Sequence, residues 1–168
     1  MRTEKRIAVL LVEDHLIVRE GLKRLLEAEK DIEVVGEAGS GRKAVELTRE
    51  LNPDVVVMDI AMPQMNGLEA TRQILEARPG AKALILSAHN DDVYVDRVLE
   101  LGAVGYLVKQ TSGRFLSEAI REVSKGRVFF SPEVAKRLEK RKEDAIGRKK
   151  TLSTFLRCAN DLAASSAQ

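Results

Sequence analysis

Acidic side chains follow two of the apolar runs in this sequence, at the point where each run ends. Glu13 and Asp14 follow the run 7–12, and Asp59 follows the run 55–58. If both runs are parallel strands with helices on both faces, their carboxyl ends share the edge of the sheet where ligands bind. Carboxylates brought together oppose joint ionisation and need a cation, and an all-oxygen ligand set suits Mg²⁺. These acids therefore predict the start of a phosphoryl-transfer site.

Two further apolar runs end in a polar or charged residue. Ser87 follows the run 83–86, and Lys109 follows the run 104–108. A carboxylate can take a phosphoryl group from a donor and form an acyl phosphate, so Asp59 is the candidate nucleophile. Lys109 would place a compact cation on phosphoryl oxygens, and the Ser87 hydroxyl could donate to another oxygen. The alternative for Asp59 is an acid that only caps a strand end; the shared edge favours the reactive site.

The order of the predicted elements must bring these residues together. Five apolar runs are short, β-branched and bounded by Gly, Pro, Asp or Asn, as buried parallel strands are; they cover residues 7–12, 32–35, 55–58, 83–86 and 104–108. Segments between them carry apolar residues three and four apart, which predicts helices. A fifth helix is expected to start after the capping candidate Ser112 and to stop at Gly126. The alternation predicts an α/β fold with a doubly wound, five-stranded parallel sheet and helices on both faces.

The remaining chain predicts one more helix. It should start at Ser131 and Pro132, because Ser suits the N-cap and Pro the first helical position. Its apolar residues are sparse, and Gly147 is expected to end it. We therefore expect a compact domain, a linker helix and a weakly ordered tail, over residues 5–126, 127–147 and 148–168 respectively.

Composition excludes several classes of protein. Cys158 is the only cysteine, so neither an intramolecular disulfide nor a zinc cluster built on thiolates is expected. The first apolar run ends after six residues, short of a signal-peptide core or a membrane span, which favours a cytoplasmic protein with no membrane partner. From Glu133 onward nine Lys or Arg stand against five acids. No aromatic residue interleaves the basic run 136–150, so it does not predict a platform for stacked bases.

Four motifs resemble the receiver domain of two-component response regulators. They are Glu13-Asp14, Met58-Asp59-Ile60-Ala61-Met62-Pro63 with Gly67, Ser87-Ala88, and Gly105-Tyr106-Leu107-Val108-Lys109. The match covers residues 5–126. It resembles the NarL/FixJ type, because Gly102-Ala103 precedes the last motif and Ala119-Ile120-Arg121 and Ser131-Pro132 follow it. The resemblance implies a flavodoxin-like sheet with strand order 2-1-3-4-5 and an extra C-terminal helix.

The resemblance also implies roles for the candidate residues. Asp59 would accept phosphate from a histidine kinase, which makes the protein a phosphoacceptor rather than an enzyme, with self-dephosphorylation as a possible further reaction. Ser87 and Tyr106 would form the switch pair that alters a protein-interaction surface. A homodimer, or a mixed dimer with related regulators, is a further expectation. The implied Mg²⁺ ligands are Asp14 and Asp59 directly, Glu13 through water, and the backbone carbonyl of Ala61.

The C-terminal part departs from the family pattern. NarL/FixJ regulators continue into a four-helix, LuxR-type DNA-binding domain, whereas 21 residues follow Gly147 here. Thr151-Leu152-Ser153-Thr154 resembles the opening of that domain, but no recognition helix can be fitted after it. We therefore expect a remnant of a transcriptional regulator's output domain, through truncation, frameshift or evolution, and no DNA binding by this chain.

Two functions of other classes compete with this interpretation. Gly39-Ser40-Gly41-Arg42-Lys43-Ala44 fits the G-x-G-x-x-A pattern of dinucleotide-binding enzymes, but it follows the second strand and leaves Lys109 unexplained. A Mg²⁺-dependent phosphatase of the haloacid-dehalogenase type also uses a strand-end aspartate, but it needs an acid where this chain has Ala61. His15 and His89 are interpreted as exposed loop residues near the rim of the site.

Overall fold

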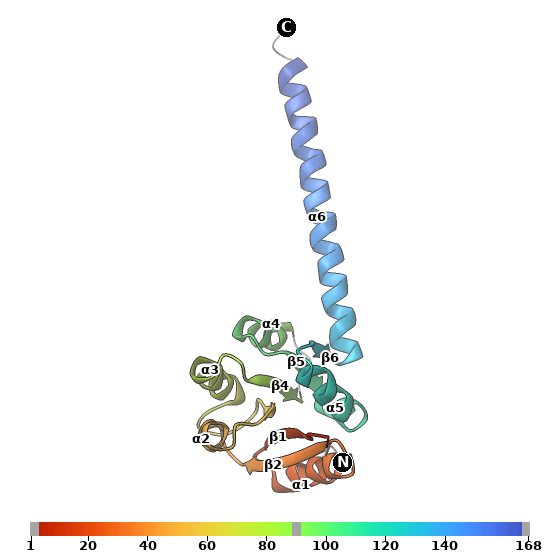
Figure 1. Ribbon diagram of the computed structural model, residues 1–168. Helices are drawn as coiled ribbons and strands as arrows, with labels where there is room; N and C mark the ends of the chain where they lie inside the picture. Colours follow the sequence, from red (N-terminus) through yellow and green to blue (C-terminus); the bar gives the residue numbers. More distant parts are fainter. Residues whose placement is uncertain (1–3, 89–91, 166–168) are drawn as a thin grey trace. The chain divides into compact units, whose positions relative to one another are not determined.

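A computed structural model describes residues 4–88 and 92–165, and the chain divides into two compact units, Met1–Ser131 and Pro132–Gln168 (Figure 1). The first unit is built on one parallel sheet with strand order β2-β1-β3-β4-β5-β6. Its strands are β1 (Ile7–Val12), β2 (Ile32–Ala38), β3 (Val55–Asp59), β4 (Lys82–Ser87), β5 (Gly105–Val108) and β6 (Phe129–Phe130). Its helices are α1 (Leu16–Glu27), α2 (Gly41–Leu51), α3 (Gly67–Ala77), α4 (Asp92–Leu101) and α5 (Lys109–Ser124).

Alternate residues of the strands form two apolar layers against the helices. Leu22 and Leu26 of α1 and Leu116 and Ile120 of α5 belong to one buried cluster, with Val9 among its strand residues. Figure 1 shows α2, α3 and α4 covering the opposite face of the sheet. Both faces of the central strands are therefore buried, which explains why those strands read as continuous apolar runs instead of alternating ones.

The sheet has six strands, so the predicted number of five was wrong, although the order 2-1-3-4-5 is present within it. β6 pairs in parallel with β5, with Gly105 opposite Phe129 and Tyr106 opposite Phe130. The Phe129 backbone N–H donates to the Val104 carbonyl at 3.0 Å. A strand of two residues has no measurable period in a sequence, and it forms here because the edge of β5 supplies the unpaired backbone groups.

Two helix boundaries also differ from the prediction. α5 begins at Lys109, directly after β5, and not after Ser112, whose hydroxyl donates back to the Lys109 carbonyl at 2.7 Å. The second unit is the helix α6 (Pro132–Ser165), which starts at the predicted proline but continues through Gly147 into the segment expected to be a weakly ordered tail. A glycine costs about 1 kcal/mol in a helix interior, and the helix formers Arg148, Lys149 and Lys150 follow it directly.

The side chains of α6 from Glu139 to Thr154 are exposed to solvent. Charged residues are spread along this part of the helix, which therefore has no apolar face long enough to form a core of its own. Among the described helices, none combines the length and the apolarity needed to cross a membrane.

Candidate functional site

The carboxyl ends of four strands meet at one edge of the sheet, as predicted. β1 pairs with β3 up to Val12 and Met58, and β4 pairs with β5 up to Ser87 and Val108. Glu13, Asp59 and Ser87 are buried there, with no more than 2% of each residue exposed. The predicted site residues therefore come together although almost a hundred positions separate the first from the last.

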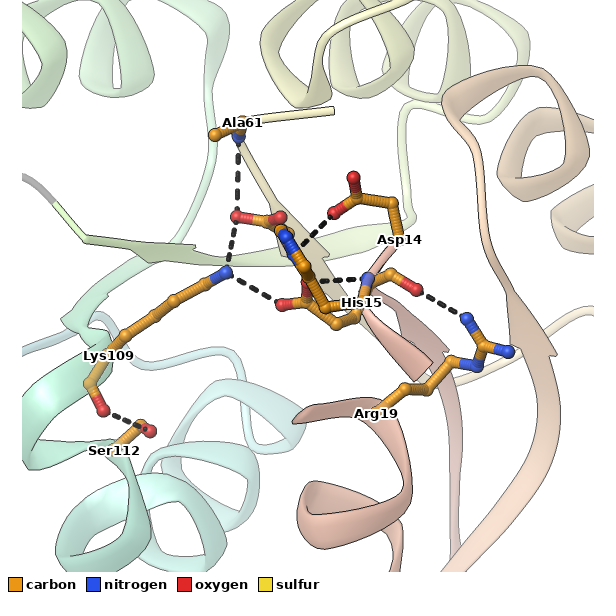
Figure 2. Close-up of polar contacts among 8 residues, drawn as sticks. Asp14, His15, Arg19, Ala61, Lys109 and Ser112 are labelled. Carbon is orange, nitrogen blue, oxygen red and sulfur yellow. Dashed lines mark hydrogen bonds and ion pairs between the residues drawn. The ribbon is translucent and has the colours of Figure 1, made fainter. Parts of the chain in front are cut away.

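Lys109 connects the ends of β1 and β3. Its Nζ atom lies 2.7 Å from Oε2 of Glu13 and 3.0 Å from Oδ1 of Asp59 (Figure 2). Burial lowers the pKa of Lys109, but its hydrogen bonds to Glu13 and Asp59 outweigh that effect and raise the pKa overall. The lysine is therefore a fixed positive charge between two buried carboxylates.

Glu13 is well supplied with hydrogen-bond donors. Besides the Lys109 contact to Oε2, its Oε1 atom accepts from the backbone N–H of His15 at 3.1 Å. Its own carbonyl accepts from Nη1 of Arg19 at 2.7 Å, which ties the end of β1 to α1. Burial raises the pKa of Glu13, but the donors from Lys109 and His15 outweigh it, and the pKa is lowered overall. Glu13 is therefore a stably ionised acid.

Asp59 has fewer hydrogen-bond donors around its carboxylate than Glu13 has. Oδ1 accepts from the backbone N–H of Ala61 at 3.3 Å and contacts Lys109. Oδ2 is buried and, within the described part of the chain, has no hydrogen-bond partner. Burial is the largest cause that raises the pKa of Asp59; the negative charge of Glu13 adds to it, and Lys109 opposes it only in part. One oxygen of this carboxylate is thus left available for a ligand.

A close backbone contact fixes the turn that carries Asp59. The Gly67 N–H donates to the Ile60 carbonyl at 2.9 Å, and a Cβ added at Gly67 would lie 1.9 Å from the Asp59 carbonyl oxygen. Only glycine fits at this position. Asn66 then caps α3, because its Oδ1 atom accepts from the Glu69 N–H at 2.9 Å. The Gly67 contact therefore holds the start of α3 directly against the end of β3.

A divalent cation fits the oxygen atoms that this network leaves over. Oδ1 of Asp14, like Oδ2 of Asp59, is buried and makes no hydrogen bond among the described residues. Carboxylate oxygens without donors are the ligands that Mg²⁺ prefers in proteins. Glu13 and Asp14 also belong to a group, with His15, whose possible ligand atoms all lie within 4.8 Å of one another. The acid pair at the end of β1 therefore has the chemistry of a cation site.

Sequence reasoning missed the part of His15 in this group. It was interpreted as an exposed loop residue near the rim, and 69% of its side chain is indeed exposed, yet its Nδ1 atom lies 3.1 Å from oxygens of both Glu13 and Asp14. Its position directly after the acid pair was the only available signal. His89 lies outside the described residues.

The two residues assigned to the switch are both buried. Ser87 is the last residue of β4, and Tyr106, the second residue of β5, has no exposed surface. Val108, on the same face of β5 as Tyr106, lies opposite Ser87 across the β4–β5 pair. A displacement at the end of β4 would therefore act on β5 directly.

The fold and this acidic site place the chain in a family of signalling proteins. The family described as the response regulator receiver domain matches residues 9–121, and the chain belongs to it. Receiver domains bind Mg²⁺ through an acidic cluster, and Glu13 and Asp14 provide such a cluster here. Membership of this family also decides against the dinucleotide-binding and phosphatase interpretations.

Relatives identified by sequence include regulators of transcription. The transcriptional regulatory protein DegU of Brevibacillus brevis is 44% identical over 137 residues, which cover 82% of this chain and 58% of DegU. The response regulator protein VraR of Staphylococcus aureus is 42% identical over 135 residues, covering 80% of this chain and 65% of VraR. This chain thus spans about three-fifths of the length of these regulators.

A solved structure agrees with the sequence relatives. The two-component response regulator of the LuxR family from Aurantimonas sp. SI85-9A1 superposes with a TM-score of 0.79 at 37% identity, covering 82% of this chain and 99% of that one.

The glycine-rich segment Gly39–Ala44 has a simpler explanation than nucleotide binding. Ser40 is the N-cap of α2, and its hydroxyl accepts from the Lys43 N–H at 3.3 Å.

Proposed function

We propose that Asp59 accepts a phosphoryl group from a histidine kinase, with Mg²⁺ bound by Asp14, Asp59, the Ala61 backbone carbonyl and, through water, Glu13. The observation that carries the proposal is the Oδ2 atom of Asp59, which is buried and has no hydrogen-bond partner among the described residues, while Lys109 holds Oδ1 at 3.0 Å. A carboxylate with one oxygen held and the other free can serve both as a nucleophile and as a ligand for Mg²⁺. Bound Mg²⁺ would neutralise charge on the phosphoryl oxygens.

The transfer forms one bond and breaks one. A carboxylate oxygen of Asp59 attacks the phosphorus of the kinase's phosphohistidine, the P–N bond breaks, and its electron pair returns to the imidazole of the kinase. Lys109 is already placed beside the carboxylate, so its ammonium group can follow the charge to a phosphoryl oxygen. Charge-assisted hydrogen bonds of this kind are about twice as strong as neutral ones. In this scheme Lys109 binds and orients, and Asp59 is the nucleophile.

The added charge would then act on the switch pair. A phosphoryl group brings about −1.5 to −2 charges and three strong acceptors, which favour a state in which the Ser87 hydroxyl moves toward it. Reversing a 1:99 equilibrium takes about 5.5 kcal/mol of differential stabilisation, which a few charge-assisted contacts can supply. Such a shift would change the surface near Tyr106, on the face of β5 covered by α4.

The partners follow from the same scheme. A histidine kinase supplies the phosphoryl group, and a second copy of the chain or a related regulator is the candidate partner for a dimer. Leu16, Ile17 and Leu25 support a protein contact on α1, because they are large apolar residues with 56%, 86% and 45% of their surface exposed. Control of transcription, as the names of DegU and its relatives indicate, would be the output of the complete system.

The direct test is the mass of the intact protein after incubation with acetyl phosphate and Mg²⁺. We expect one added phosphate that is labile to hydroxylamine and is lost in Asp59→Asn. Asp54→Asn is the matched control, because Asp54 lies at the other end of β3, where it accepts from the Ala8 N–H at 2.8 Å. An adduct that persists in Asp59→Asn, or no adduct where Mg²⁺ binding is shown separately, would refute the proposal.

A further inference from the structure

The imidazole of His15 has no part in the proposed phosphoryl transfer, yet it points into the acid pair. Its Nδ1 atom lies 3.1 Å from Oε1 of Glu13 and 3.1 Å from Oδ1 of Asp14. Figure 2 shows the ring placed beside the Asp14 carboxylate. A nitrogen at equal distances from two carboxylate oxygens is either a hydrogen-bond donor to them or a third ligand for the same cation.

The two distances from Nδ1 of His15 match those between neighbouring ligands of a metal ion. Neighbouring ligands of an octahedral ion with bonds of 2.0–2.1 Å lie about 3 Å apart. The atoms offered by Glu13, Asp14 and His15 all lie within 4.8 Å of one another. Both oxygens of Glu13 already have donors, the His15 backbone N–H on Oε1 and Lys109 on Oε2, so Glu13 is placed to bind through water while Asp14 and His15 bind directly.

A second observation points to a ligand independently of the acid pair. Oδ2 of Asp59 is buried, belongs to a residue with 1% of its surface exposed, and has no hydrogen-bond partner within the described chain. Oδ1 of Asp14 also makes no hydrogen bond there, in spite of its nearness to His15. The hydrogen bonds of the protein thus leave one acceptor unsatisfied after β1 and one at the end of the neighbouring strand β3, where a cation could be bound.

We propose that His15 makes this a mixed nitrogen and oxygen site, which selects a first-row transition ion such as Ni²⁺ over Mg²⁺. The inference rests on the cation site of the proposed function and adds one ligand to it. Imidazole suits Ni²⁺, Zn²⁺, Cu²⁺ and iron, whereas Mg²⁺ prefers carboxylates, carbonyls and water. The pair of carboxylates serves both kinds of ion, and the nitrogen serves only the first kind.

The test is isothermal titration of the tag-free full chain with Ni²⁺ and, separately, with Mg²⁺. Loss of groups that merely support a metal ligand costs 10–100-fold in affinity, so His15→Ala should weaken Ni²⁺ binding at least about tenfold. Mg²⁺ binding should stay the same or tighten, because a competing donor has left the acids. In the wild type, paramagnetic Ni²⁺ should shift the ring protons of His15. His89→Ala removes the only other histidine and should change neither affinity.

Other results of these titrations would contradict the inference. If His15→Ala weakens both ions equally, His15 only positions the acids, and the inference fails. If His89→Ala causes the loss of Ni²⁺ affinity, the nitrogen ligand is another residue, and the inference fails again. A phosphate adduct on Asp59 with Mg²⁺, together with Ni²⁺ affinity independent of His15, would overturn this inference alone. Absence of both cation binding and the adduct would also overturn the proposed function.

Discussion

Glu13 and Asp59 are two buried carboxylates on neighbouring strands, and both contact the same lysine, yet they are in different electrostatic states. Glu13 has donors on both oxygens, and its pKa is lowered because Lys109 and His15 outweigh its burial. Asp59 has donors on one oxygen, and burial together with the charge of Glu13 raises its pKa. The number of donors, and not the depth of burial, therefore separates the acid that supports the site from the acid proposed to accept the phosphoryl group.

The largest expected effect concerns the turn that places Asp59. In Gly67→Ala the new Cβ would meet the Asp59 carbonyl, where nothing flexible can give way. Overpacking costs about 1–3 kcal/mol and occasionally more, so we expect the upper end, about 3 kcal/mol, in urea unfolding. Gly80→Ala is the control, because no atom lies within 4 Å of an added Cβ there. A loss below about 1 kcal/mol for Gly67→Ala would show that the backbone of β3 can relax.

The next effect concerns Glu13, the acid with hydrogen-bond donors on both oxygens. Glu13→Gln keeps the shape of the side chain but removes the charge that Lys109 binds at 2.7 Å. Hydrogen bonds to charged groups contribute about 1.5–3 kcal/mol, and we expect a loss in the lower half of that range because Lys109 keeps its contact to Asp59. The free energy of unfolding in urea at pH 7 measures it. An unchanged value would mean that Glu13 does not support the fold.

The third effect has the opposite sign and gives the sharpest contrast. Asp59→Asn removes a buried carboxylate that has few hydrogen-bond donors. The free energy of unfolding of the variant should therefore not fall below that of the wild type, and a gain of up to about 0.5–2 kcal/mol is expected. Residues that serve a reactive site commonly lower the stability of the fold, and their replacement raises it. Thermal unfolding of the two proteins in parallel is the measurement. A clear loss of stability in Asp59→Asn would abolish the distinction between the two acids.

The smallest effect comes from an ion pair on the surface. Nε of Arg121 donates to Oδ2 of Asp31 at 2.7 Å, and this contact lowers the pKa of Asp31. Because the folded pKa is the lower one, the contribution is present above the unfolded value of about 3.9 and is lost as the pH falls through the folded pKa. Asp31→Asn should cost about 0.2–1 kcal/mol at pH 7 and less at pH 3, measured by urea unfolding. A loss at pH 3 as large as that at pH 7 would exclude the ion pair as its cause.

The sequence predicted those parts of the site that depend on strand ends. Glu13, Asp59, Ser87 and Lys109 each follow or end an apolar run, and parallel pairing brings such positions to one edge. Donor counts were beyond prediction, because the backbone N–H groups of His15 and Ala61 and the side chain of His15 meet the acids only through the exact course of their loops. The sequence alone therefore could not show which of the two acids has fewer hydrogen-bond donors.

Predictions of the fold failed where a signal was local and short. Two residues of β6 are too few to show a period, and Gly147 is an end signal that the neighbouring helix formers overcome. The capping chemistry of Ser112 predicted that α5 starts after that residue, but the helix begins at Lys109, directly after β5. In each case tertiary or neighbouring context outweighed a single residue.

The residue that follows β6 is also hydrogen-bonded to β5. The Ser131 N–H donates to the carbonyl of Tyr106 at 2.9 Å, so the last residue before α6 is bonded to the backbone of the residue assigned to the switch. A hydrogen bond of this kind transmits displacement along its axis without any side chain in between. A movement of β5 at Tyr106 would therefore be passed by this backbone hydrogen bond to Ser131, the residue at which the first unit ends.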